Sequence, residues 1–270
     1  MNERTAKMRF FETDDASKRY VAGRTFFHPL ALARVKSALP MNVLSDGLDV
    51  GCGTGLSTVA LLALARKVIG IDRSRAMISR AAQHENVTYQ VATAEQLIFD
   101  DGSFDLVSMC QVFHWIEPGL ALPELSRVLR SPGYLIVYDN YFLGRSTDEN
   151  QFEDWFLHGF LERYPTPDRG LPSASREDLA TFGFHLVYED SYANDIAFTQ
   201  SQLVNYFLSI SNVIAQTGDE IGVHEARSWL VAQTAPFFEK QPSIKICHRS
   251  PIMVAKKGSV GSVFAASCAD

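Results

Sequence analysis

The stretch LDVGCGTG at residues 48–55 decides the fold class of this chain. Its first three residues end a short buried strand, and the alternating glycines that follow lead into a helical pattern. Glycine is favoured where the backbone must turn tightly and let a ligand approach. The spacing is G-x-G-x-G, which differs from the G-x-G-x-x-G of dinucleotide binders. The stretch therefore predicts a strand, a ligand-binding turn and a helix; the alternative is a glycine-rich turn without a ligand.

A strand–helix rhythm continues on both sides of this stretch. Apolar spacing predicts helices over 29–39, 54–66 and from Ser74 to about residue 84, and strands over 67–72, 87–91, 104–110 and 134–139. Strands that alternate with helices of this length indicate parallel βαβ units, so we expect an α/β fold with helices on both faces of the sheet.

The rhythm breaks after residue 139, which gives the expected domain organisation. The expected segments are an N-terminal, partly mobile arm (1–24), a cofactor-binding core (25–140), a helical cap (141–240) with one returning strand at about 184–192, a last core strand (241–257) and a Gly/Ser-rich disordered tail (258–270). The ring-rich start of the cap is expected on one long helix, and residues 199–215 and 220–233 on two more. Pro251 weakens the prediction of the last strand.

Composition excludes several classes of protein. The 270 residues carry a net charge of −6, and Lys256-Lys257 is the only basic pair that stands out, so a nucleic-acid partner is not expected. The four cysteines are far apart and form no C-x-x-C pair, which disfavours zinc and a disulfide framework. The chain shows no signal-peptide pattern, and its longest apolar run, 59–65, is too short to cross a membrane. These features favour a cytoplasmic protein without a membrane partner; a homodimer stays open.

Two acidic residues refine the ligand prediction. Asp49 precedes the glycine turn, where a carboxylate would repel a pyrophosphate but suits the ammonium group of an amino-acid tail. Asp72 ends the next strand, 17 positions after Gly55. In nucleoside-binding α/β folds an acid at that place accepts hydrogen bonds from the ribose diol. The alternative for Asp72 is an ordinary helix cap.

With these motifs in order, the chain resembles the class I S-adenosylmethionine-dependent methyltransferases, in the small-molecule branch of ubiquinone-biosynthesis-type and trans-aconitate-type enzymes. The matching strings are LDVGCGTG (48–55), GIDRSRAMI (70–78), ATAEQLIFDDGSFDLV (92–107), QVFHWI (111–116) and ELSRVLRSPGYLIV (124–137). The resemblance implies a Rossmann-like sheet of seven mostly parallel strands with one antiparallel strand near the C-terminus. It implies S-adenosylmethionine as the cofactor.

The resemblance also implies which residues surround the cofactor. Gly51, Cys52, Gly53 and Gly55 would form the loop beneath it, and Asp72 would hold the ribose. The other implied cofactor residues are Arg73, Met77, Thr93, Ala94, Glu95, Gln111, His114 and Trp115. Many relatives carry Asp where this chain has Thr93, and a hydroxyl can still accept a hydrogen bond from the adenine amino group.

Two further cofactor residues that the resemblance implies, Tyr20 and Arg24, carry an alternative, and so does His114. Tyr20 and Arg24 match a Tyr and an Arg that often fold over the cofactor in this branch, or they are surface residues on a mobile arm. His114 follows the fourth strand, where an imidazole would be a general base. Packing of His114 against Trp115, which would shape the cofactor pocket, is the interpretation we favour.

Missing motifs narrow the reaction. The Asn-Pro-Pro-Tyr of DNA amino-methyltransferases, the metal-binding carboxylates of catechol-type enzymes and the paired glutamates of protein arginine methyltransferases are all absent from the sequence. We therefore expect methyl transfer by in-line displacement, without a metal, to a small, largely apolar or aromatic molecule. Tyr141, Phe156 and Phe207 are its expected contacts. The alternatives are a non-catalytic S-adenosylmethionine-binding subunit and an NAD-dependent oxidoreductase, although Leu56 stands where the oxidoreductase fingerprint needs glycine.

Overall fold

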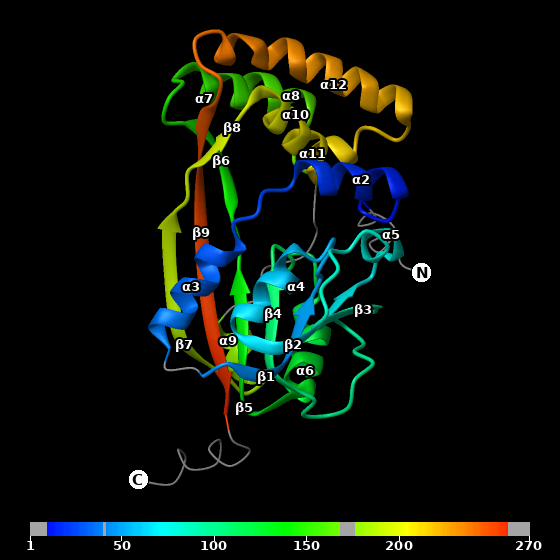
Figure 1. The fold of residues 1–270 in the computed structure, drawn as a ribbon, viewed down its shortest axis with the longest axis vertical. Helices are drawn as coiled ribbons and strands as arrows, with labels where there is room; N and C mark the ends of the chain where they lie inside the picture. Colours follow the sequence, from blue (N-terminus) through cyan, green and yellow to red (C-terminus); the bar gives the residue numbers. More distant parts are fainter. Residues whose placement is uncertain (1–9, 40–41, 168–175, 259–270) are drawn as a thin grey trace. The chain divides into compact units, whose positions relative to one another are not determined.

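A computed structural model describes residues 10–39, 42–167 and 176–258 (Figure 1). Within them the chain divides into two compact units. One unit, here called the helical unit, holds residues 10–26, 140–167 and 191–250. The other, the sheet unit, holds residues 27–139 apart from 40–41, together with 176–190 and 251–258. The glycine turn lies in the sheet unit.

Five parallel strands form the centre of the sheet unit, in the order β3-β2-β1-β4-β5. They are β1 Leu44–Val50, β2 Ala65–Asp72, β3 Val87–Val91, β4 Phe104–Cys110 and β5 Leu129–Tyr138. The strand β9 (Ile244–Lys257) pairs antiparallel with β5, and β7 (Phe184–Ala193) pairs with β9. These seven strands, with one antiparallel strand near the C-terminus, confirm the Rossmann-like fold that the resemblance implied.

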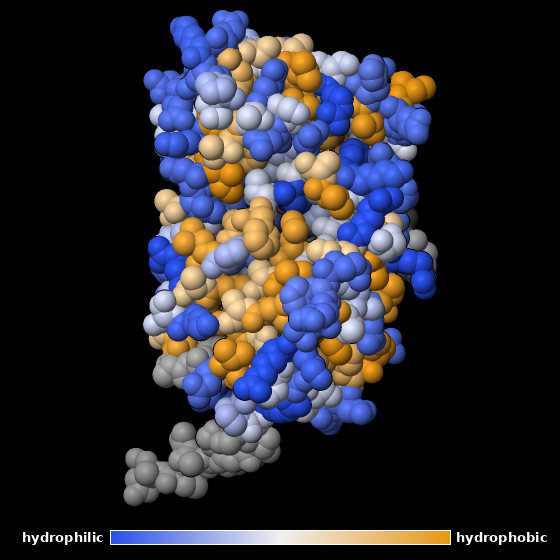
Figure 2. Space-filling model, viewed as in Figure 1, coloured by the Kyte–Doolittle hydropathy of each residue, from blue (hydrophilic) through white to orange (hydrophobic). Residues whose placement is uncertain are grey.

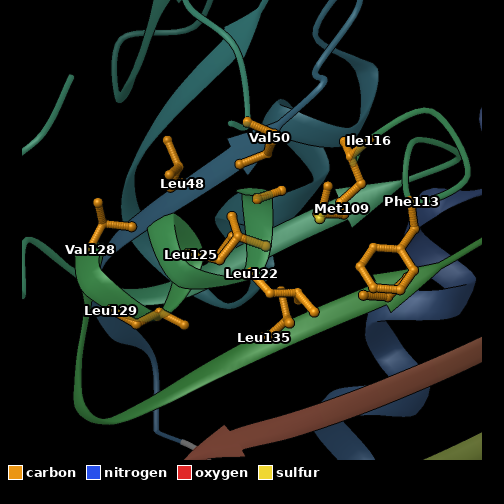
Figure 3. Close-up of a cluster of buried hydrophobic side chains, with 14 of the residues drawn as sticks. Leu48, Val50, Met109, Phe113, Ile116, Leu122, Leu125, Val128, Leu129 and Leu135 are labelled. Atoms are coloured by element: carbon orange, nitrogen blue, oxygen red, sulfur yellow. The ribbon is translucent and has the colours of Figure 1, made fainter. Parts of the chain in front are cut away.

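Helices cover both faces of this sheet. They are α3 His28–Ala38, α4 Leu56–Ala60 with the short turn η1 Leu61–Ala63, α5 Arg75–Ile78, α6 Pro118–Val128 and α9 Arg176–Thr181. In Figure 1, α3 and α4 lie on one face, and α6 lies on the other. The core between α6 and the sheet is apolar: Leu122 and Leu125 of α6 are fully buried among side chains such as Leu48, Val50 and Met109 (Figure 3). Burial of each such side chain stabilises the fold by about 1.5–3 kcal/mol.

The helical unit is built around aromatic rings. Its elements are α2 Asp14–Gly23, β6 Tyr141–Ser146, α7 Gln151–Trp155, the π-helical turn η2 Phe156–Phe160, α8 Leu161–Arg163, β8 Ile196–Phe198, α10 Gln200–Leu208, α11 Ser211–Ile214, α12 Glu220–Thr234 and η3 Ala235–Phe238. The strands β6 and β8 pair antiparallel with the first half of β9. Phe152, Phe160 and Phe207 are completely buried at the centre of the unit.

Several predicted elements differ from the observed ones. The helix predicted over 54–66 is only α4 plus η1, because β2 already starts at Ala65, which pairs with Leu44 of β1. The helix predicted from Tyr141 begins as strand β6, where Phe142 pairs with His248. Helix 199–215 is interrupted after residue 208.

The N-terminal arm differs as well. Its described part forms the capped helix α2, which the sequence pattern did not predict, and the side chain of Thr13 accepts the first-turn hydrogen bond. Mobility of the arm stays a prediction. Residues 1–9 and the tail from 259 onward lie outside the described residues.

Pro251 is compatible with β9 because of where it lies along the strand. The pairing of β9 with β6 ends at Arg249, and its pairing with β5 starts at Ile252. Pro251 falls between the two ladders, and its carbonyl accepts a hydrogen bond from the backbone N–H of Asp139. A missing N–H at this position therefore removes no bond from either ladder.

The exposed apolar residues do not by themselves indicate a binding surface. Figure 2 shows hydrophobic residues among hydrophilic ones on the viewed face. Exposed large apolar residues of the sheet unit include Leu30, Val43 and Leu120, and scattered residues of this kind are normal on soluble proteins. Among the described residues, no helix has the length and apolar character needed to cross a membrane.

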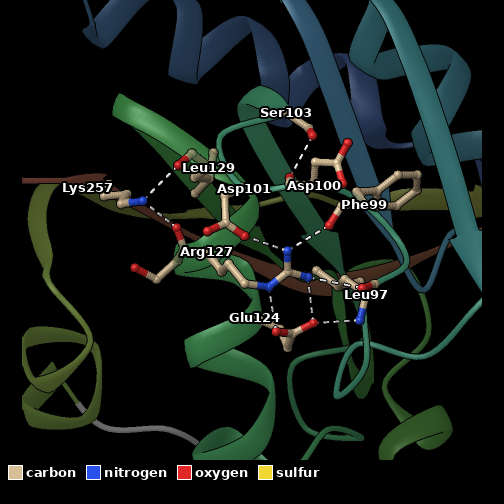
Figure 4. Close-up of polar contacts among 10 residues, drawn as sticks. Leu97, Phe99, Asp100, Asp101, Ser103, Glu124, Arg127, Leu129 and Lys257 are labelled. Carbon is tan, nitrogen blue, oxygen red and sulfur yellow. Dashed lines mark hydrogen bonds and ion pairs between the residues drawn. The ribbon is translucent and has the colours of Figure 1, made fainter.

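Arg127 of α6 holds the loop that joins β3 to β4 (Figure 4). Its guanidinium pairs with both oxygens of Glu124 at 2.8 and 2.9 Å and donates to the carbonyls of Leu97 and Phe99 at 3.0 and 2.7 Å. Glu124 in turn accepts the backbone N–H of Leu97 at 2.8 Å. This pairing raises the pKa of Arg127 and lowers that of Glu124. The loop therefore leaves β3 in one defined conformation.

The substitution Arg127→Lys tests this role. A single ammonium group cannot replace the planar fork of donors, so we expect the free energy of unfolding to fall by about 1–2 kcal/mol. The matched control is Arg66→Lys, an exposed site in the same unit, where we expect a change within about 0.5 kcal/mol. Urea unfolding curves of both variants measure this, and equal midpoints would contradict the role of Arg127.

Candidate active site

The loop between β1 and α4 has the backbone that its glycines predict. Gly51, Gly53 and Gly55 have φ angles of 71°, 54° and 82°, in the left-handed region that side chains disfavour. A Cβ atom on Gly51 would lie 2.4 Å from Val112, and one on Gly55 would lie 2.2 Å from the hydroxyl of Tyr89. The loop therefore needs glycine both for its backbone conformation and for the close approach of its neighbours.

Hydrogen bonds fasten this loop to the end of β2. Two successive loop amides donate to the carbonyl of Ile71 at 2.8 and 2.9 Å. The next amide, of Gly53, donates to one carboxylate oxygen of Asp72 at 2.9 Å, and the amide of Ser74 donates to the other at 2.8 Å. Asp72 is only partly buried, so its carboxylate is accessible beside the loop. Asp72 therefore fits the ribose diol of a nucleoside that lies on the loop.

Asp49 lies beneath the loop and is completely buried. One of its oxygens accepts hydrogen bonds from Ser57 at 2.6 Å and Thr58 at 2.8 Å, which fixes the first turn of α4 against β1. The other oxygen has no partner with hydrogen-bond geometry among the described residues. Burial raises the pKa of Asp49 to about 6, and the nearby charge of Asp72 adds to the rise. The hydroxyls of Ser57, Thr58 and Ser108 oppose this rise. Contact of Asp49 with an ammonium group stays a prediction.

Residues next to the loop differ in their exposure. Cys52 is buried, and burial raises the pKa of its thiol well above the usual value, which argues against a nucleophilic role. Arg73 is exposed directly after Asp72. Met77 is buried in α5, whose N-terminus is capped by the Ser74 hydroxyl as predicted.

The expected adenine-side residues share the segment after β3. Thr93 is exposed, Ala94 is buried, and Glu95 is partly buried. Glu95 accepts a hydrogen bond from the backbone N–H of Glu117 at 3.3 Å. Arg127 holds the same loop a few residues further along, so Ala94 and Glu95 have a fixed position near the carboxyl ends of β2 and β3.

The segment after β4 carries the most strained backbone near the loop. Gln111 has a φ of 57°, the only positive value among the non-glycine residues that the structure describes. Such a conformation costs about 1–3 kcal/mol and is concentrated at functional sites. His114 and Trp115 follow on a turn, with ring centroids 5.3 Å apart. This contact agrees with packing of His114 against Trp115; its role as a base stays open.

A buried polar cluster, which the sequence did not single out, lies at the ends of β4 and β5. His28, at the start of α3, lies 3.1 Å from the hydroxyl of Tyr138 and 3.5 Å from the sulfur of Cys110, both measured from Nδ1. Cys110 and Tyr138 face each other across the two strands. Burial lowers the pKa of His28 to about 4, so the ring is neutral at physiological pH. The sequence signal was weak because a single His before a helix-starting Pro has many structural roles.

Tyr20 and Arg24 belong to the helical unit. The guanidinium of Arg24 lies 4.5 Å from the centre of the Tyr20 ring and donates to the carbonyl of Ser209 at 3.2 Å. Arg19 donates to the neighbouring carbonyl of Leu208 at 3.3 Å. Cations at the last carbonyls of a helix are stabilising, so the two arginines hold α2 against the end of α10. Closure of Tyr20 and Arg24 over a cofactor stays a prediction.

The three expected acceptor contacts also lie in the helical unit, with different exposure. Tyr141 has 39% of its surface exposed and Phe156 is partly buried, whereas Phe207 is completely buried. The ring of Phe207 lies 4.4 Å from that of Phe160, which makes it part of the core of the unit.

No group of three or more His, Cys, Asp or Glu side chains able to hold a metal ion occurs in the part of the chain that the structure describes. The candidate site therefore consists of the glycine loop, the two carboxylates Asp49 and Asp72, the segment after β3 and the strained turn after β4. This set can hold a nucleoside with a charged amino-acid tail.

Comparison with known proteins identifies relatives of the segment that carries the candidate site. Residues 48–137 match the profile of a family described as "Methyltransferase domain". The malonyl-[acyl-carrier protein] O-methyltransferase of Herminiimonas arsenicoxydans is 36% identical over 158 residues, which are 57% of this chain and 56% of that protein. The chain spans about half the length of the curated relatives it matches. Over residues 48–137 the chain is therefore similar to methyltransferase domains.

Solved structures share the fold. A candidate type II methyltransferase from Anaeromyxobacter dehalogenans has a TM-score of 0.63 at 23% identity, covering 85% of this chain and 96% of its own. The phosphoethanolamine N-methyltransferase 2 of Haemonchus contortus, solved with S-adenosyl-L-methionine, has a TM-score of 0.53 at 18% identity, with coverage of 96% and 60%. The [4+2]-cyclase SpnF has a TM-score of 0.51 at 21% identity, with coverage of 85% and 80%. At these identities the likeness shows the fold alone.

The shifted pKa values of His28 and Asp49 predict opposing effects of pH on stability. Between pH 4 and 6.5 the unfolded chain protonates His28 and the folded chain does not, so this residue makes stability rise with pH. Between pH 3.8 and 6 the folded chain keeps a proton on Asp49 that the unfolded chain has lost, so this residue makes stability fall with pH. Each shift corresponds to about 3 kcal/mol, and in the wild type the two nearly cancel.

Single variants separate the two effects. From pH 4.5 to 6.5 the free energy of unfolding of His28→Gln falls relative to the wild type, whereas that of Asp49→Asn rises, by about 1–3 kcal/mol in each case. Urea unfolding at several pH values measures the slopes, so a uniform loss of stability does not affect the result. Parallel slopes for both variants and the wild type would contradict the prediction.

Proposed function

We propose that this protein is an active methyltransferase that transfers the methyl group of S-adenosylmethionine to a small, largely apolar or aromatic molecule. The observation that carries the proposal is Asp72, which is fastened to a positive-φ glycine loop within a segment that matches the methyltransferase domain family. Fold alone would not support an activity, because one fold hosts many functions.

The residues of the site have distinct tasks in this proposal. The glycine loop lets the ligand approach the backbone, Asp72 binds the ribose, and Asp49 fixes the start of α4. Ala94 and Glu95 line the adenine, and Gln111 and His114 lie beside the methionine part. The cofactor supplies a methyl group activated on a sulfonium. The chain has only to orient the acceptor for in-line displacement and to exclude water, so a metal is not needed.

The proposed acceptor site lies among the rings of the helical unit. Tyr141 and Phe156 offer partly accessible aromatic surface, and Phe207 supports them from the core. Aromatic surface of this kind favours an apolar acceptor. The net charge of −6 argues against nucleic acid, whose phosphates require basic contacts. The second candidate function, a cofactor-binding protein without methyl transfer, is motivated by the cyclase that shares this fold.

Asp72→Ala tests the cofactor assignment. The ribose loses hydrogen bonds to a charged group, so we expect the affinity for S-adenosylmethionine and for S-adenosylhomocysteine to fall by about 1.5–3 kcal/mol. Calorimetry measures both ligands, and the exposed Asp100→Ala is the matched control in the same unit. Unchanged affinity in a folded Asp72→Ala protein would contradict the assignment of Asp72 as the residue that binds the ribose of the cofactor.

Transfer of labelled methyl groups tests the activity. The full chain is incubated with methyl-labelled S-adenosylmethionine and a metabolite extract, and mass spectrometry identifies labelled products. We expect a labelled small molecule, formed equally well with EDTA. Loss of product in EDTA that Mg²⁺ restores would contradict the metal-free reaction. Binding of the cofactor without any labelled product would favour the second candidate function.

A further inference from the structure

His248 of β9 is a buried imidazole in the helical unit with one nitrogen left unpaired. The side chain is 1% exposed. Its Nδ1 lies 2.9 Å from the carbonyl oxygen of Ile246. Because a carbonyl only accepts, Nδ1 carries the proton and Nε2 carries a free lone pair. Nε2 has no hydrogen-bond partner among the described residues.

Three aromatic rings lie around the imidazole of His248. Phe142 of β6 meets it edge-on at 5.4 Å, Phe198 of β8 stacks on it at 6.2 Å, and Tyr206 of α10 meets it edge-on at 6.3 Å. Phe142 and Tyr206 also stack on each other at 5.2 Å. These four residues, His248, Phe142, Phe198 and Tyr206, are called the ring cluster below. Phe142 is only partly buried, so the ring cluster reaches the surface of its unit.

A purely structural role accounts poorly for an imidazole at this place. A buried acceptor without a partner destabilises the fold, and a phenylalanine ring would fill a similar space without that cost. The bond from Nδ1 to Ile246 spans only two residues of the same strand, so it does not tie distant segments together. What it does is fix the tautomer and the orientation of the ring, as hydrogen bonds do for functional histidines.

The surroundings define what Nε2 can accept. Burial lowers the pKa of His248 although the bond to Ile246 and the charge of Asp195 oppose this, so the ring is neutral and acts as an acceptor. Burial also raises the pKa of Tyr206 to about 12, so its hydroxyl is neutral as well. A neutral acceptor among ring faces matches an uncharged, flat molecule with one O–H or N–H donor.

We propose that the ring cluster binds a planar aromatic molecule with a hydroxyl or N–H group, which donates a hydrogen bond to Nε2 of His248. This deepens the proposed function by naming the acceptor class, and the ligand is the methyl acceptor only if that function holds. The binding itself requires neither cofactor nor turnover.

The experiment compares two probes that differ in a single donor. The full chain is titrated with 2-naphthol and with 2-methoxynaphthalene, which has the same ring system but no hydroxyl proton. In the wild type we expect 2-naphthol to bind about three- to tenfold more tightly, the usual worth of a neutral hydrogen bond. His248→Asn keeps an amide donor for the Ile246 carbonyl and lacks Nε2, so we expect the preference to disappear.

Controls separate this effect from misfolding. His224→Asn makes the same change at an exposed site in the same unit and should keep the preference. In the wild type, the ¹⁵N resonance of the unprotonated His248 nitrogen should shift with 2-naphthol and not with 2-methoxynaphthalene, a readout that needs no variant. Equal affinity for the two probes, no binding of either, or an unshifted resonance would overturn the proposal. Since no S-adenosylmethionine is used, failure of methyl transfer leaves this result unaffected.

Discussion

The hydrogen bonds between the glycine loop and the end of β2 are the constraint on which the candidate site depends. Two loop amides share the carbonyl of Ile71, and a third binds Asp72. With these bonds in place the loop can hold three residues in the left-handed region, and Asp72 is held beside it. Parallel pairing then brings the ends of β3 and β4 to the same edge of the sheet. Residues 40 to 60 positions apart in sequence therefore lie at the same edge of the sheet.

The two faces of this sheet follow different physical rules. Asp49 pairs in register with Ser108, and Cys110 pairs with Tyr138, so these polar residues share the face that α3 and α4 cover. Leu48 and Val50 point to the other face and join the apolar core under α6. Burial alone stabilises the apolar face, but on the polar face each group needs a partner. Ser57 and Thr58 partner Asp49, and His28 partners Tyr138.

Sequence patterns predicted the sheet unit well because its signals are local. The string at residues 48–55, the acid at Asp72 and the Ser74 cap each depend on neighbours within a few positions, and all three lie where they were expected. Predictions failed where distant pairing overrode local preference. Tyr141 and Phe142 lie on a strand because β9 offers an open ladder about a hundred residues later, and helical spacing cannot reveal that. The cluster around His28 joins three segments that are far apart in sequence, so no local sequence motif predicts it.

The two buried histidines, His28 and His248, differ in their hydrogen bonds. This difference is the basis for assigning a structural role to His28 and proposing a ligand-binding role for His248. His28 and His248 are both buried, and burial lowers the pKa of each. At His28 the nitrogen Nδ1 is shared between a phenol and a thiol from two neighbouring strands, so the imidazole links α3 to the sheet. At His248 the one bond is local, and the remaining nitrogen has a lone pair that meets no donor within the described part of the chain. When the one hydrogen bond of a buried imidazole only orients the ring, its second nitrogen can accept a hydrogen bond from a ligand. This distinction is the reason for proposing His248, rather than the core residue Phe207, as the group that contacts the ligand of the helical unit.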